Sequence, residues 1–156
     1  MELMKVKLED VIERIEFANE SNKSYLNKST SEIHLIPEEV DMYIESELFD
    51  EEDLPDWEKE IVPIAKDILE NPENYIPLPD QFDINGYEIM ERFVLSLTNN
   101  ELRNEIYYSI KGKGAFRKFK DKILQHGIEN DWYKFREESM REIAIDWCKE
   151  NNIEFY

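Results

Sequence analysis

The sequence predicts a helix-dominated α+β fold in one compact domain, with an N-terminal helix and a β-hairpin followed by a multi-helix C-terminal bundle. Three observations predict it. Apolar residues recur at intervals of three and four in several segments, two short runs near the N-terminus flank a turn, and 156 residues is a usual size for one domain. Within this domain, 1–46 and 57–156 are a possible subdivision.

The N-terminal part is expected to form a helix, a hairpin and a second helix. Over 7–19, the apolar residues Leu8, Val11 and Ile15 share one helical face. The runs 23–27 and 32–36 surround the turn-prone sequence Lys-Ser-Thr-Ser, which predicts a β-hairpin. Pro37 suits a helix start, so a short helix should follow to about residue 46.

An acidic linker and a broken helix are expected next. Residues 47–56 hold six carboxylates and should be exposed. Asp56 is expected to cap a helix anchored by Trp57, and Pro63 should kink this helix over 57–70 or divide it in two. The prolines in 75–79 permit an extended edge segment but exclude a central strand.

The C-terminal half reads as a series of helices. Apolar spacing and breakers predict helices over 84–97, 100–110, 115–127 and 131–150. Asp83 precedes the first of these, and glycines flank the third. Residues 153–156 are suited to a terminal strand.

Composition limits the class of protein. The longest apolar runs are far shorter than the roughly 18 residues of a membrane span, and the first ten residues lack the apolar run of a secretory signal. Cys148 is the only cysteine, so an intrachain disulfide is impossible. These features predict a soluble cytoplasmic protein without a membrane partner. The net charge of −18 makes it acidic and disfavours generic nucleic-acid binding over the whole surface.

Against this acidic background, one segment is basic. Residues 111–122 contain 6 of the 19 lysines and arginines but only 1 of the 37 aspartates and glutamates. Helical spacing places Arg117, Lys118 and Lys122 opposite Phe116 and Phe119. The sequence therefore predicts a basic outer face on this helix.

The basic segment predicts an anion-binding site. Glycine lacks a Cβ, so backbone N–H groups near Gly112 and Gly114 can approach a phosphate, and a helix start attracts negative charge. The candidate residues are Lys111, Gly112, Lys113, Gly114, Arg117, Lys118 and Lys122. The alternative interpretation is structural, with the glycines ending one helix and starting another while the bases pair with acidic surface. The spacing matches neither a phosphate-binding loop of nucleotide hydrolases nor a dinucleotide fingerprint.

Other candidate sites have ordinary explanations. The acids of 47–56 lack the alternating ligands and central glycine of a calcium loop. His34 and His126 form no recognisable ligand pair, and Cys148 is typical of a small buried hydrophobe. We therefore assign no catalytic residue, no metal site and no cofactor.

Three segments resemble a known bacterial family. They are 75–79 with 82–84, then 110–121, which contains Gly-Ala-Phe-Arg, and 132–151, which contains Trp-Cys-Lys-Glu-Asn. On these residues the chain resembles uncharacterised protein family 0158. Lys113 and Lys118 stand where the family is expected to show arginine, which keeps the charge but loses the bidentate fork. The resemblance implies a bacterial cytoplasmic protein and carries no established activity.

Function stays unknown at this level, with a leading hypothesis and an alternative. The leading hypothesis is a non-enzymatic binding or regulatory module that contacts an anionic partner, such as phosphate or an RNA backbone, through the basic helix. The alternative is a self-associating interaction domain whose basic helix docks on the acidic surface of a second copy. An enzyme is the less favoured third class.

Overall fold

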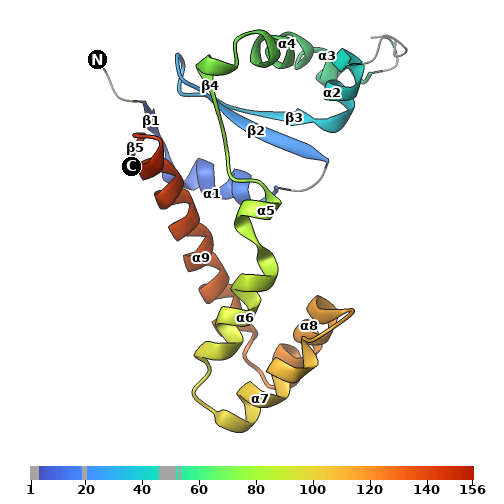
Figure 1. Cartoon of the computed structure of the whole chain (residues 1–156), viewed down its shortest axis with the longest axis vertical. Coiled ribbons are helices and arrows are strands. Elements are labelled where there is room, and N and C mark those ends of the chain that lie inside the picture. The colour runs from blue at the N-terminus through green and yellow to red at the C-terminus, as the bar shows by residue number, and fades with distance from the viewer. Residues whose placement is uncertain (1–3, 19–20, 46–51, 53) are drawn as a thin grey trace. The chain divides into compact units, whose positions relative to one another are not determined.

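The computed structural model describes residues 4–18, 21–45, 52 and 54–156, and is helix-dominated α+β as predicted (Figure 1). By their internal contacts the residues form two compact units. Unit 1 is Met1–Ile84 with Ile143–Tyr156, and unit 2 is Asn85–Glu142. The chain therefore leaves unit 1, builds unit 2 and returns to complete unit 1.

Unit 1 holds all the described strands and the shorter helices. Its elements are β1 Lys5–Val6, α1 Leu8–Glu16, β2 Asn22–Asn27, β3 Ile33–Pro37, α2 Glu38–Glu45, α3 Asp56–Lys59, α4 Val62–Glu70, a 3-10 turn Pro72–Asn74, β4 Tyr75–Pro77, α5 Gln81–Ile84 and β5 Glu154–Phe155. Unit 2 contains α6 Gly86–Ser96, α7 Asn100–Ser109, α8 Ala115–Gln125 and the first part of α9 Glu129–Glu150.

The predicted hairpin is present and forms the centre of unit 1. β2 pairs antiparallel with β3, with Tyr25 opposite His34, and antiparallel with β4, with Leu26 opposite Ile76. The sheet order is β3-β2-β4, so the proline-containing segment is an edge strand. Strand alternation then sends Tyr25 and Leu26 to opposite faces.

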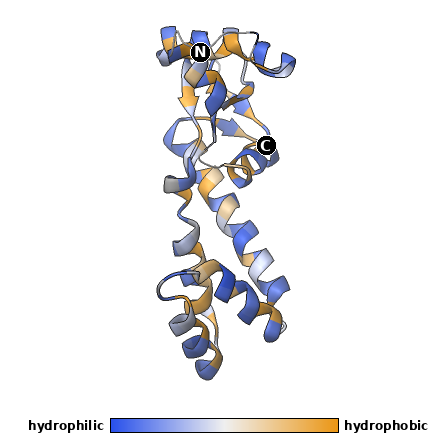
Figure 2. Cartoon of the chain, turned by 90° about the vertical axis from the view of Figure 1, so that its right-hand side faces the viewer, coloured by the Kyte–Doolittle hydropathy of each residue, from blue (hydrophilic) through white to orange (hydrophobic). Residues whose placement is uncertain are grey.

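The two faces of this sheet are covered by different helices. Ile36, Val40, Val62 and Ala65 form a buried cluster under α2 and α4, and Tyr25 packs against it. On the opposite face lies α1 (Figure 1), whose Val11 and Ile15 are buried as their spacing predicts. Figure 2 shows hydrophobic and hydrophilic residues alternating along the helical ribbons, the pattern of helices with one buried face.

Both ends of the chain meet in a second small sheet. β1 and β5 pair in parallel, with Val6 opposite Phe155. The backbone N–H of Leu8 also donates to the carbonyl oxygen of Tyr156 at 3.0 Å. The terminal strand was expected from the sequence, but its partner β1 was not.

Helix boundaries in unit 1 correct three expectations. Pro37 ends β3 rather than opening α2, and Asp56 is the first residue of α3 rather than its cap, which is Pro55. Trp57 does not anchor its helix: it is 57% exposed, because the short α3 turns Glu58 inward instead. The acids 47, 50, 51 and 53 of the expected linker lie outside the described residues.

Unit 2 is held by an aromatic core. Phe93 of α6 makes edge contacts with Phe119, Trp132 and Phe135, at centroid distances of 6.0, 5.4 and 5.4 Å. α6 is capped by Asn85, whose side chain accepts from the N–H of Glu88, whereas Asp83, expected to precede this helix, lies within α5. The apolar faces predicted for α6 and α8 thus meet the start of α9.

Candidate anion-binding site

The candidate site comprises the loop 111–114 and α8, both in unit 2. Gly112 and Gly114 have φ of +92° and +72°, in the left-handed region that favours glycine. No atom lies within 4 Å of a Cβ added at either position, so there is space for a side chain at both glycines. Conformation and not crowding explains both glycines.

The start of α8 is open. Gly114 occupies the cap position without a side chain to satisfy the first N–H groups, and the first turn carries no acidic residue. Its first helical hydrogen bond runs from the N–H of Lys118 to the carbonyl of Gly114, at 3.0 Å. The N–H groups that precede Lys118 in α8 have no partner within the helix. Together with the helix dipole they make this helix end electrostatically suited to an anion.

Two of the predicted bases are neutralised within unit 2. The Nζ of Lys111 lies 3.7 Å from Glu91 and 4.0 Å from the ring centre of Tyr107. A hydrogen bond with Tyr107 raises the pKa of Lys111, and the charge of Glu91 adds to the shift. Lys111 is therefore committed to α6 and α7.

Lys122 is the second paired base. It is partly buried and donates to Glu105 at 2.8 Å, and this hydrogen bond lowers the pKa of Glu105. His126 approaches the other oxygen of the same carboxylate at 3.1 Å. The expectation that Lys122 lies on the outer arc is wrong, because its position borders the buried face of α8 and it turns toward α7.

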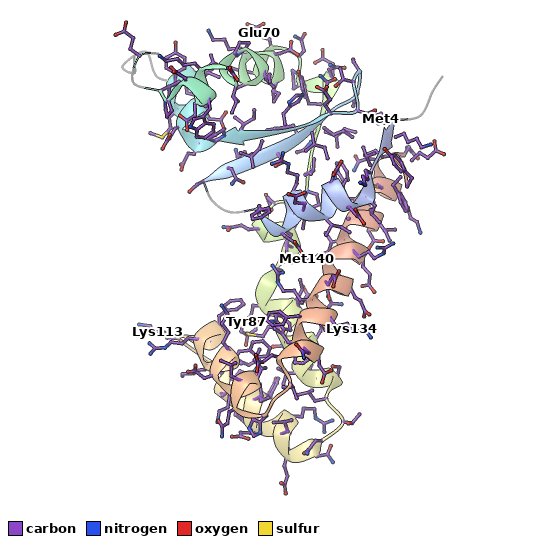
Figure 3. The ribbon with its side chains drawn as sticks, turned by 180° about the vertical axis from the view of Figure 1, so that it is seen from behind. Met4, Glu70, Tyr87, Lys113, Lys134 and Met140 are labelled. Carbon is purple, nitrogen blue, oxygen red and sulfur yellow. The ribbon has the colours of Figure 1, made fainter. Side chains whose placement is uncertain are left out.

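The remaining three bases stay available. Lys113, Arg117 and Lys118 are exposed and form no ion pair with any described residue. Lys113 extends from the loop away from the ribbon (Figure 3). On α8, the buried residues Ala115, Phe119 and Ile123 define the opposite side, which fixes the outer face predicted for Arg117 and Lys118. The structure therefore keeps part of the predicted set together and removes two members.

Sequence reasoning missed the residues that divide the set. Glu91, Glu105 and Tyr107 come from α6 and α7, and no local signal in 111–122 points to them. The only available hint was that Lys122 lies close to the apolar edge of its helical wheel.

Charge is segregated between the two units. Unit 2 contains 11 of the 19 bases and 10 of the 37 acids, whereas unit 1 contains 8 bases and 27 acids. The formal charge is thus +1 for unit 2 and −19 for unit 1. The exposed bases of α8 lie in the nearly neutral unit.

The structure also places Cys148 and His34, two residues considered as candidates from the sequence. Cys148 is fully buried, and burial raises the pKa of its thiol, which disfavours the reactive thiolate. On β3, the Nε2 of His34 lies 3.7 Å from the Oε2 of Glu32, which immediately precedes the strand. Within the described residues, no group of three or more potential ligands is placed to hold a metal ion. None of the described helices combines the length and apolar character that crossing a bilayer requires.

Comparisons with known proteins give a family and no activity. Residues 1–156 match the family described as "Uncharacterised protein family (UPF0158)". A UPF0158 protein of Pseudomonas aeruginosa is 24% identical over 89 residues, covering 56% of this chain and 58% of that protein. The chain thus matches little more than half the length of this curated relative. No solved structure matches the chain.

Proposed function

The chain belongs to the uncharacterised bacterial family UPF0158, and from that premise we propose that it is a non-enzymatic binding module of the cytoplasm. Its basic surface, Lys113, Arg117 and Lys118, contacts a phosphate-bearing partner, with an RNA backbone as the case to test first. The observation that carries this proposal is the exposure of these three bases without ion pairs to described residues, while Lys111 and Lys122 are neutralised.

The geometry favours phosphates over other anions for two reasons. Exposed bases beside an uncapped helix start combine point charges with oriented N–H donors, which is the usual arrangement for phosphate oxygens. Unit 2, which contains α8, has a formal charge of +1, so the acids of this unit do not outweigh its bases.

Fluorescence anisotropy of a short labelled single-stranded RNA tests the proposal. We expect binding that weakens steeply with salt, and a slope of log affinity against log salt that falls by about 1.4 in Arg117→Ala/Lys118→Ala, since each phosphate contact contributes roughly 0.7. Lys134→Ala/Arg141→Ala is the matched control, because it removes two exposed charges from α9 of the same unit. Equal losses in both variants, or no binding at low salt, would refute the proposal.

A second candidate is supported by the charge contrast between the units. The basic surface of one copy complements the −19 charge of unit 1 in another, and Phe116 and Leu124 add apolar area on α8, at 51% and 58% exposure. Light scattering across protein and salt concentrations distinguishes the two. A dimer that dissociates with salt supports self-association, and a monomer under all conditions eliminates it.

A further inference from the structure

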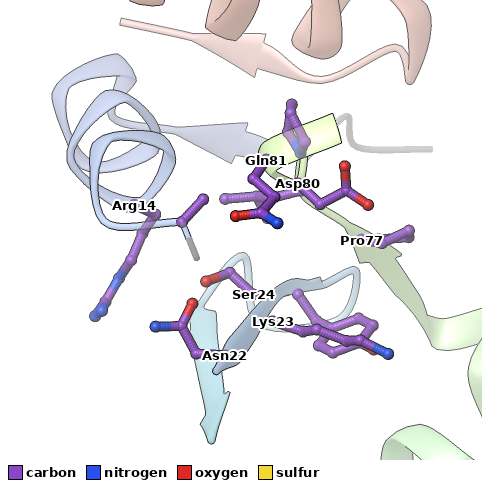
Figure 4. Close-up of a pocket in the computed structure, with 11 residues that line it drawn as sticks. Arg14, Asn22, Lys23, Ser24, Pro77, Asp80 and Gln81 are labelled. Atoms are coloured by element: carbon purple, nitrogen blue, oxygen red, sulfur yellow. The ribbon is translucent and has the colours of Figure 1, made fainter. Parts of the chain in front are cut away.

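A cavity in unit 1 lies outside the candidate site. It has a volume of about 330 Å³ and lies between α1, β2 and the connection from β4 to α5 (Figure 4). Ligand sites for small molecules start at roughly this size. Every residue that lines it belongs to unit 1, so it is independent of the basic surface on α8.

The cavity exists because β4 separates from β2. The last bond between them runs from the N–H of Leu78 to the carbonyl of Ser24, at 2.9 Å. Pro79 has no N–H to continue the ladder. Asp80 then turns the chain into α5, where it exchanges backbone-to-carboxylate hydrogen bonds with Asp83 at 2.9 and 3.1 Å. The edge of β2 beyond Ser24 is thereby left open toward the end of α1.

Polar side chains from three elements border this opening. In Figure 4, Asn22 and Ser24 of β2 and Gln81 of α5 lie along one side of the space, and Arg14 of α1 lies on the other. Lys23 and Asp80 point away from Arg14. Leu78, which is buried, and Ala18 contribute apolar lining. The lining thus holds two cations, Arg14 and Lys23, one carboxylate, Asp80, several neutral hydrogen-bonding groups and an apolar wall, so cations outnumber carboxylates in this cavity.

Arg14 identifies the charge of the ligand. It is one of 8 bases in a unit with 27 acids, yet it forms no ion pair with a described residue. Arg14 is partly buried, and its guanidinium is a planar fork that matches a carboxylate through two parallel hydrogen bonds. The surrounding acids oppose large polyanions far more than a single carboxylate, because the repulsion grows with the charge of the ligand.

We propose that this cavity binds a small carboxylic acid with an apolar body, its carboxylate held by Arg14 and its body against Leu78 and Ala18. Neutral hydrogen-bonding groups of Asn22 and Ser24 orient the carboxylate. A cavity of this volume admits a single-ring acid, so benzoate is a suitable probe and benzamide is its uncharged isostere.

Titration followed by amide NMR spectra of the intact protein tests this site. We expect benzoate to shift the amide signals of Ser24, Leu78 and Gln81, and to bind at least about tenfold more tightly than benzamide. Arg14→Gln should remove that preference while leaving benzamide binding unchanged. Lys66→Gln, which removes an exposed cation on α4, should leave both affinities unchanged.

A cavity-filling variant separates occupancy from charge. Ala18→Leu should abolish the binding of benzoate and benzamide together, because it occupies the apolar part of the space. The proposal is overturned if benzoate does not shift these signals up to its solubility limit, or if it shifts them equally in wild type and Arg14→Gln. Since α8 takes no part, failure here leaves the RNA result unaffected, and the reverse also holds.

Discussion

Units 1 and 2 differ in their net charge and in how their charged side chains are paired or buried. Unit 1 carries 27 acids and 8 bases and places a carboxylate, Glu58, at 2% exposure. Unit 2 is close to neutral, and it pairs Lys111 with Glu91 and Lys122 with Glu105. Lys113, Arg117 and Lys118 are not included in that pairing. The difference teaches that the basic surface is distinguished by its unpaired members and not by the number of bases in the segment.

The largest expected effect concerns the core of unit 2. Phe119→Ala should lower the free energy of unfolding by about 3–5 kcal/mol, because Phe119 is 1% exposed and contacts Phe93 and Trp132. Phe116→Ala, on the exposed side of α8, is the control and should cost less than about 1 kcal/mol. Calorimetry also tests the predicted single domain: one transition that shifts as a whole supports it, and movement of only one of two transitions contradicts it.

The next effect tests the buried acid of unit 1. Burial raises the pKa of Glu58, as does its hydrogen bond with Glu39, and its Oε2 has no partner among the described residues. A carboxyl whose pKa is higher in the folded chain than in the unfolded chain favours folding when it is protonated. The carboxyl therefore lowers the free energy of unfolding as the pH rises above its pKa in the unfolded chain. Glu58→Gln should therefore stabilise by about 1–2 kcal/mol at pH 7 and by almost nothing near pH 4.

Glu60→Gln controls for general charge removal in this test, since Glu60 is exposed nearby. Thermal unfolding across pH measures both variants. Equal stabilisation by the two changes would show that burial of Glu58 is not the cause.

A smaller effect is expected from salt. Self-repulsion among the acids destabilises unit 1, so 0.5 M salt should raise the opening free energy of its amides by about 1 kcal/mol. Hydrogen exchange at Leu26 and Ile36, compared with Phe93 and Ile106 of unit 2, measures the contrast. If 0.5 M salt does not slow hydrogen exchange in unit 1 more than in unit 2, self-repulsion among the acids does not destabilise unit 1.

The smallest effect separates paired from unpaired bases. Lys122→Gln should lower stability by about 0.5 kcal/mol, because it removes a partly exposed ion pair. Lys118→Gln, one turn earlier on the same helix, should leave stability unchanged and weaken RNA binding instead. Chemical denaturation and anisotropy on both variants give the two readouts, and a reversed pattern would contradict the assignment.

Sequence patterns predicted elements whose signals are local. Two short runs on either side of the turn-prone residues 28–31 located the hairpin. Of the two outcomes expected from Pro63, a kinked helix or two short ones, the structure has two, α3 and α4. The strand β1 was missed because two residues, Lys5 and Val6, carry no periodic signal and depend on a partner at the other end of the chain.

The same distinction applies to the sites. The basic segment is visible in composition, but its division into paired and unpaired members depends on Glu91 and Glu105, which reach it only through tertiary packing. The cavity beside Arg14 had no sequence signal at all, since its lining comes from α1, β2 and α5.

The pairing of β1 with β5 also sets an order of events during synthesis. Residues 143–156 leave the ribosome after all of unit 2, so unit 1 cannot close until Asn85–Glu142 has been made. At roughly 5–20 residues per second, those 58 residues impose a delay of about 3–12 s. During that interval the nascent chain carries an unpaired β1 and an incomplete acidic unit, and a nascent-chain chaperone has its opportunity to bind there.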